Sequence, residues 1–145
     1  MVSITCRRTN EGCHDAHRTL ALQIPLITQE FPEISDCYHG TVNVRLDVGL
    51  QIKNYDYQTN PIIWEPQGSP EVFGFLRICF EAPINTPAFK AWLYIAHNSP
   101  HYGDPTFHEV IAKKLDLQGV LACRINFDRQ IEQTIFNGSQ IISVV

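Results

Sequence analysis

The stretch YHGTVNVRLD, residues 38–47, joins a turn to a run of alternating apolar and polar side chains. Val42, Val44 and Leu46 are apolar, and polar residues stand between them, which is the pattern of a half-buried β-strand. The opposite face of this strand carries a row of polar side chains: Thr41, Asn43, Arg45 and Asp47. Such a row is either the solvated side of a sheet or a place where the protein holds a ligand.

The composition is that of an ordinary globular domain. The chain has 145 residues, of which 44% are hydrophobic and 18% charged, so we expect one domain over residues 1–145. The net charge of −4 disfavours a nucleic-acid partner, which would require a clustered basic face. No apolar run approaches the roughly 20 residues of a membrane-spanning helix, and the N-terminus lacks the apolar stretch of a secretory signal. The sequence therefore predicts a cytoplasmic protein with no membrane partner.

The cysteines give no sign of a disulfide framework. There are five, an odd number, and no two stand at the Cys-x-x-Cys spacing of a zinc site: Cys6, Cys13, Cys37, Cys79 and Cys123. Cys79 and Cys123 lie in apolar runs, where a free thiol behaves as a small hydrophobic side chain.

Most of the chain has the pattern of short strands separated by Pro and Gly. We expect one helix, opened by Pro25 and ended by Pro32. Asn137-Gly138 stands between two apolar runs, which indicates a hairpin. The expected strands are 19–24, 41–52, 72–82 with 89–97 as its hairpin partner, the start of 106–117 before a short helical turn, 119–128, and two within 133–145. This spacing favours a small all-β or β-rich barrel or sandwich with one short helix.

Several side chains around 97–109 could bind a metal. His97, His101 and His108 fall close together, with Asp104 and Glu109 among them. Imidazole and carboxylate groups at this density suit Zn²⁺. Their spacing matches no established motif such as His-Glu-x-x-His, and loops collect polar residues in any case. A metal-dependent hydrolase would require the three histidines to converge in space.

The polar row of 38–47 suggests a different kind of site. Thr41 and Asn43 are two residues apart and project from the same face of the strand. Their hydroxyl and amide oxygens are neutral hard ligands, suited to Mg²⁺ when phosphates supply the remaining charge. Gly40 would allow a phosphate or another backbone to come close. Lys113-Lys114 is either a phosphate contact or a solvated surface pair. The chain has no P-loop, no Gly-x-Gly-x-x-Gly motif and no Gly-x-Ser-x-Gly elbow.

Three segments resemble the archaeal-type, CTP-dependent riboflavin kinases, which have a small cradle-loop β-barrel fold. HGTVNVRLD is similar to that family's Gly-Thr-Leu-Asn-(Val/Leu)-(Arg/Lys)-Leu-Asp segment. Upstream, EGCHDAHRTLALQIPLITQEF resembles its glycine-rich loop, strand and first helix. Downstream, SPHYGDPTFHEVIA and KKLDLQG resemble its Thr-His-Tyr loop, Glu-(Val/Ile)-Ile-Ala strand and following turn. The resemblance covers residues 11–126.

The resemblance implies an activity and a set of site residues. Thr41 and Asn43 would bind the Mg²⁺ that accompanies the nucleotide phosphates, and Glu109 would contact the flavin. The other expected contacts are His101 to the substrate and Gly12, Gly40 and Lys113 to the nucleotide. The reaction implied is transfer of the CTP γ-phosphoryl group to the ribityl 5′-hydroxyl of riboflavin, which depends mostly on positioning and charge neutralisation.

Other positions depart from the family pattern. Only Gly12 remains of the glycine-rich loop, since His14 and Ala16 stand at the other two glycine positions. Pro100 replaces the threonine of the Thr-His-Tyr loop, and a Pro-x-x-Leu-Arg stretch that helps bind the nucleotide is missing. These departures favour a rival hypothesis, a non-catalytic barrel that binds a flavin, a nucleotide or a protein.

Overall fold

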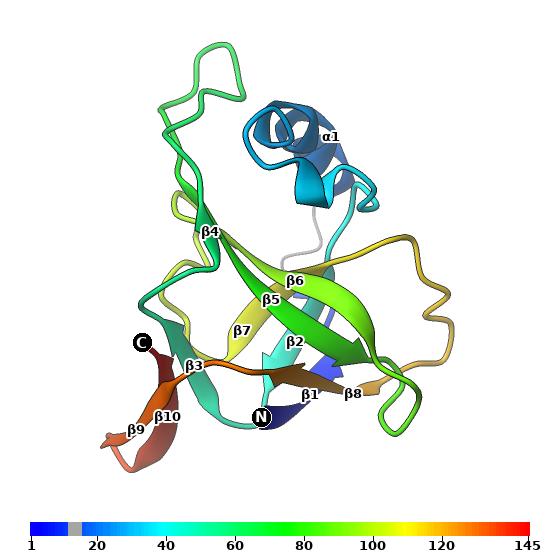
Figure 1. Ribbon diagram of the computed structural model, residues 1–145, viewed down its shortest axis with the longest axis vertical. Coiled ribbons are helices and arrows are strands. Elements are labelled where there is room, and N and C mark those ends of the chain that lie inside the picture. The colour runs from blue at the N-terminus through cyan, green and yellow to red at the C-terminus, as the bar shows by residue number, and fades with distance from the viewer. Residues whose placement is uncertain (12–15) are drawn as a thin grey trace.

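The computed structural model describes residues 1–11 and 16–145, and it shows a β-rich barrel with one short helix, as predicted (Figure 1). Six strands pair antiparallel in the order β5-β6-β7-β2-β1-β8, and β8 pairs back with β5, which closes the barrel. The barrel strands are β1 (Val2–Arg8), β2 (Val42–Leu46), β5 (Phe73–Glu81), β6 (Phe89–Ala96), β7 (Phe107–Ile111) and β8 (Ala122–Phe127). The other elements are α1 (Ala16–Ile27), the 3-10 turn η1 (Pro32–Ile34), β3 (Gly49–Ile52), β4 (Tyr57–Gln58), β9 (Ile131–Phe136) and β10 (Ser139–Val144).

The barrel interior is a continuous apolar core. The apolar residues of β2 face inward, as the alternation in 38–47 predicts, and Val44 is completely buried. Every other barrel strand contributes side chains to the same core, including Ile4, Cys6, Leu76, Ile78, Leu93, Val110, Cys123 and Ile125. Each strand therefore has one face in the interior, and the opposite face is left for other contacts.

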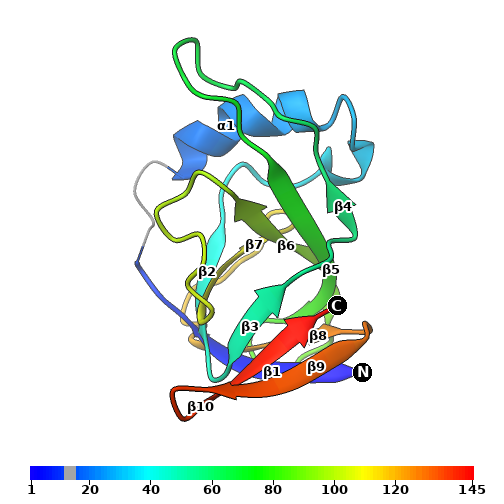
Figure 2. The same ribbon diagram turned by 90° about the vertical axis from the view of Figure 1, so that its left-hand side faces the viewer.

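A second core forms on the outside of the barrel. Leu20, Ile24 and Ile27 are buried at helical spacing on α1, and they cluster with outward-facing side chains of three strands: Phe73 and Phe75 of β5, Trp92 and Tyr94 of β6, and Ile111 of β7. Figures 1 and 2 show α1 at one end of the molecule and the β9–β10 hairpin at the other. The outer wall beneath α1 is therefore a covered surface.

The strand predicted over 19–24 is wrong, because this segment is helical. Its apolar residues alternate by coincidence: Leu20 and Ile24 share the buried face of α1, whereas Leu22 is exposed. Pro25 does not open the helix but lies in its last turn, where it removes one backbone hydrogen bond. α1 therefore ends inside the helix that was predicted over 25–32, and the separate 3-10 turn η1 begins at Pro32.

The remaining strand predictions succeed with changes in their bounds. The stretch 41–52 is two strands, because the chain turns after Leu46 and β3 leaves the barrel to pair in parallel with β10. β5 and β6 pair antiparallel, as predicted. The β9–β10 hairpin is confirmed, and both Asn137 (φ 50°) and Gly138 (φ 78°) have the positive φ that its tight turn requires.

Three further features of the chain were not predicted correctly. β4 lies in a stretch with no predicted strand. β1 has no counterpart among the predicted strands, although it pairs with both β2 and β8. The helical turn expected after β7 is not formed within 112–117. Among the described residues, no helix has both the length and the apolar character needed to cross a membrane.

Candidate functional site

The polar row of β2 lies on the outer face of the barrel, where Asn43 is buried and Asp47 is exposed. Asn43 lies directly opposite Glu109 of β7, and Glu109 lies opposite Tyr94 of β6. Residues opposite one another in antiparallel strands project from the same face, so these three side chains form one row across three strands. Asn43 is only 3% exposed. At this position the polar row is therefore buried within the protein rather than solvated.

Thr41, Asn43 and Glu109 bring three oxygen-bearing groups together. The Thr41 hydroxyl donates a hydrogen bond of 2.6 Å to Asn43 Oδ1, and it is also hydrogen-bonded to the Glu109 carboxyl. Asn43 Nδ2 donates to the Glu11 carbonyl oxygen at 2.8 Å, which fixes the amide so that Oδ1 faces Thr41. A hydroxyl, an amide oxygen and a carboxyl are hard ligands, so this donor set fits Mg²⁺.

Burial changes the acidity of Glu109. Loss of solvent raises the pKa of its carboxyl to about 7, and the hydrogen bond with Thr41 opposes this rise. Close to neutral pH the carboxyl is therefore present in both its protonated and its ionised form. It can donate a hydrogen bond in one form and accept one, or bind a cation, in the other.

A pocket of about 510 Å³, here called the helix-side pocket, opens beside this row. Its volume lies within the range of small-molecule sites. The lining comes from α1, the 64–71 segment, the 98–101 loop and the strand row: Thr19, Leu20, Gln23, Thr41, Trp64, Glu65, Gly68, Ser69, Glu71, Tyr94, Ala96, Asn98, Ser99, Pro100, His101 and Glu109. These described residues include three carboxylates and neither Lys nor Arg.

Glu71 has a structural role within that lining. Its two carboxylate oxygens accept hydrogen bonds from Trp64 Nε1 at 2.8 Å and from the Asn98 backbone N–H at 2.7 Å. It thereby ties the 64–71 segment to the loop after β6. Glu109 is the carboxyl of the pocket whose pKa is raised.

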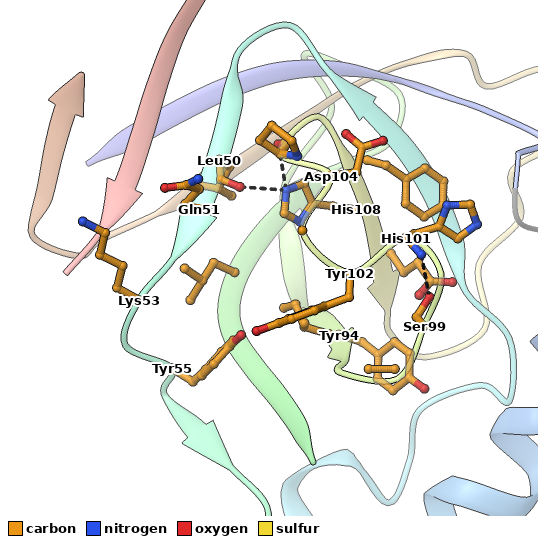
Figure 3. A pocket seen from close by; sticks show the side chains of 17 residues that line it. Leu50, Gln51, Lys53, Tyr55, Tyr94, Ser99, His101, Tyr102, Asp104 and His108 are labelled. Carbon is orange, nitrogen blue, oxygen red and sulfur yellow. Dashed lines mark hydrogen bonds between the residues drawn. The ribbon is translucent and has the colours of Figure 1, made fainter. Parts of the chain in front are cut away.

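A second pocket of about 300 Å³, the loop-side pocket, lies between β3 and the 99–105 loop (Figure 3). The hydroxyls of Tyr55 and Tyr102 point toward each other across it. The Tyr55 hydroxyl is also 3.2 Å from His97 Nε2. Five residues line both pockets: Tyr94, Ala96, Ser99, His101 and Glu109. A ligand in either pocket can therefore reach Glu109.

The histidines predicted as metal ligands serve separate contacts. His108 is buried, and its Nε2 lies 3.2 Å from the Leu50 carbonyl oxygen and 3.1 Å from that of Pro105. Burial lowers its pKa, so the ring is neutral and Nε2–H is the donor to both. The His101 ring packs 4.2 Å from the ring of Phe107. Within 1–11 and 16–145, no group of three or more His, Cys, Asp or Glu side chains is placed to hold a metal ion.

The other predicted residues lie in different surroundings. His101 lines both pockets, in reach of a bound substrate. A side chain at Gly40 would meet the Tyr38 ring at 2.7 Å, so this glycine makes room for Tyr38. Lys113 is ion-paired with Asp36 at 3.4 Å and lines neither pocket. Gly12 and His14 lie outside the described residues.

Arg45 connects two segments that border the site. Its guanidinium donates to both carboxylate oxygens of Glu11, at 2.7 and 2.9 Å, and to Asp104 at 2.7 Å. Hydrogen bonds from Arg45 lower the pKa of the Glu11 carboxyl to about 2. Arg45 therefore holds the chain before α1 close to the 99–105 loop, and its two charged partners neutralise it.

Sequence reasoning missed two residues that fasten α1 to the site. The Tyr94 hydroxyl donates to Gln23 Oε1, and both side chains are buried. Tyr94 stands in an apolar strand, where nothing marks it as functional. Gln23 could have been found from a helical periodicity, because it falls on the face of Leu20, Ile24 and Ile27.

Comparison with known proteins supplies no assignment. No family model matches the chain, and no curated protein matches it.

Proposed function

We propose that the chain is a Mg²⁺-dependent kinase of the riboflavin kinase type. It transfers a phosphoryl group from a nucleoside triphosphate, CTP by resemblance, to riboflavin or a related small molecule. One observation supports this most. Two separate segments were expected to supply the metal ligands and the flavin contact, and their residues lie in one corner of adjacent strands: Thr41, Asn43 and Glu109. Thr41 and Glu109 of that corner also line a pocket large enough for a small molecule.

Each residue has a role in this proposal. Thr41 and Asn43 hold Mg²⁺, which when bound supplies the charge neutralisation that phosphoryl transfer needs. The carboxylates of the helix-side pocket repel a triphosphate, so a bound cation is needed before the nucleotide can approach. Glu109 binds the polar edge of the flavin, since its carboxyl can donate or accept a hydrogen bond near neutral pH. Trp64 and Tyr94 offer aromatic surface to the ring.

A second candidate is a barrel that binds a flavin without turnover. It is favoured by the charge of the helix-side pocket, whose described lining contains neither Lys nor Arg to position a triphosphate. The exposed Lys113, expected to contact the nucleotide, is paired with Asp36 outside both pockets.

A turnover assay separates the two. Purified protein is incubated with riboflavin, MgCl₂ and CTP or ATP; FMN is measured by chromatography and flavin binding by fluorescence. Thr41→Val keeps the shape of the side chain and removes its oxygen, so FMN formation should fall by at least about tenfold. Thr134→Val is the matched control, because Thr134 is exposed on β9 and lines neither pocket; it should retain wild-type activity.

The outcomes are distinct. FMN formation that depends on Mg²⁺ and on Thr41 supports the kinase. Saturable flavin binding with no FMN from either nucleotide contradicts the kinase and supports the binding barrel. Absence of both binding and turnover overturns both candidates.

A further inference from the structure

Two cysteines that are distant in sequence face each other inside the barrel. Cys6 of β1 lies directly opposite Cys123 of β8 in the antiparallel register. Both are buried in the interior core, at 4% and 0% exposed, and their side chains are hydrogen-bonded to each other. None of the other described cysteines has a cysteine as its strand partner.

The Cα separation of this pair lies within the range that a disulfide can bridge. Arg8 N donates to Leu121 O at 2.9 Å, two residues along the same register. Hydrogen-bonded pairs recur every second residue in an antiparallel ladder, so Cys6 and Cys123 also form one, with Cα atoms about 5.5 Å apart. Disulfides bridge Cα atoms about 4.4–6.8 Å apart.

The two thiols differ in their readiness to ionise. The hydrogen bond with Cys123 and burial raise the pKa of the Cys6 thiol. The hydrogen bond from Cys6 and the charge of Arg8 lower the pKa of the Cys123 thiol. The Arg8 guanidinium is fixed nearby by hydrogen bonds to the carbonyl oxygens of Leu117 and Val120, at 2.7 and 3.1 Å. The Cys123 thiol donates to the Leu121 carbonyl oxygen at 3.7 Å, and of the two thiols it is the one whose surroundings favour ionisation.

We propose that Cys6 and Cys123 are the site of a reversible disulfide, formed by peroxide, that links β1 to β8. The Cys123 thiolate attacks one oxygen of hydrogen peroxide, which breaks the O–O bond and gives a sulfenic acid and hydroxide. Cys6 sulfur then attacks the sulfenic sulfur, forming the S–S bond and releasing water. The hydroxide takes up a proton lost by the thiols, so two thiols and one peroxide give one disulfide and two waters.

This disulfide is easily reduced. Opposite Cβ atoms in antiparallel strands lie about 4.5–5.5 Å apart, farthest in hydrogen-bonded pairs, whereas a disulfide requires about 3.5–4.5 Å. The strands must draw together, and a bond formed under strain returns readily to two thiols. The inference is independent of the proposed kinase activity, because neither cysteine lines a pocket.

Peptide mapping of the native protein after treatment with hydrogen peroxide tests the proposal. The expected result is a cross-linked peptide joining Cys6 to Cys123, loss of two hydrogen masses per chain, and return to the starting mass with dithiothreitol. Cys123→Ala should abolish the cross-link, whereas Cys79→Ala, at an exposed position, should leave it intact. The same treatment in denaturant should give mixed pairings.

If Cys123→Ala fails to fold, the peptide map of the wild-type protein still decides the test. Both cysteines recovered as free thiols after Cys79 has been oxidised would overturn the proposal. A native cross-link between any other pair of cysteines would overturn it equally.

Discussion

Glu109 is the residue that connects the fold of this protein to its proposed chemistry. The register of β2, β7 and β6 places it between Asn43 and Tyr94, on the wall that both pockets share. Burial raises the pKa of its carboxyl to about 7. A group that titrates near neutrality within a pocket is a candidate for ligand recognition, because small changes in its surroundings change its charge.

The same shift predicts how stability depends on pH. The folded state holds the Glu109 proton up to about pH 7, whereas a free Glu carboxyl has a pKa of 4.5. Folding therefore gains from protonation at low pH, and this gain is lost as pH rises from 4.5 through 7. Between about pH 5 and pH 8, the free energy of unfolding of the wild type should fall by about 2 kcal/mol relative to Glu109→Gln.

Urea denaturation of both proteins across this pH window measures the difference. Glu109→Gln keeps the shape of the side chain and cannot titrate, so it is the matched control for the wild type. A constant difference between the two proteins from about pH 5 to pH 8 would contradict the raised pKa of Glu109.

At the scale of single elements, β5 and the segment before β4 meet through a close contact. The Tyr55 ring lies against Gly74, where a β-carbon would come within 2.6 Å of Tyr55 Cδ1 and 2.7 Å of Cζ. Tyr55 also lines the loop-side pocket and contacts His97. The loop-side pocket can therefore have this shape only because Gly74 has no side chain.

Gly74→Ala tests this contact. The added methyl group should displace the Tyr55 ring and lower the free energy of unfolding by about 1–3 kcal/mol. The matched control is the same substitution in a Tyr55→Ala background, where the space is open and the effect should nearly vanish. Thermal or urea denaturation of the four proteins gives the coupling energy. Equal destabilisation in both backgrounds would show that Tyr55 is not the obstacle.

Helices and strands could be predicted from the sequence where only one spacing of apolar residues fits the segment. The apolar side chains of β2 alternate because only one face of this strand packs in the barrel interior: Val42, Val44 and Leu46. Asn137-Gly138 specifies the β9–β10 hairpin through its backbone conformation alone. The segment 19–24 fits both a strand and a helix pattern over six residues. Its helical face becomes visible only when Ile27 is included, beyond the proline that was expected to mark a boundary.

At the scale of the whole molecule, the site exists because the barrel has two apolar surfaces. Its interior holds one core, and α1 covers part of the outer wall with another. The sequence indicated a strand with a polar row at Thr41 and Asn43, but it could not show that residues of α1 and Tyr94 line one pocket with Thr41. Tyr94 and Gln23 escaped prediction for the same reason, since their contact joins elements that are distant in the chain.

A crystal structure of the protein with riboflavin, MgCl₂ and a non-hydrolysable CTP analogue tests the central claim most directly. We predict the flavin ring against Glu109 and Tyr94, with Mg²⁺ coordinated by the side-chain oxygens of Thr41 and Asn43. An empty Glu109 corner at saturating ligand, or a flavin bound at a surface remote from both pockets, would contradict the account.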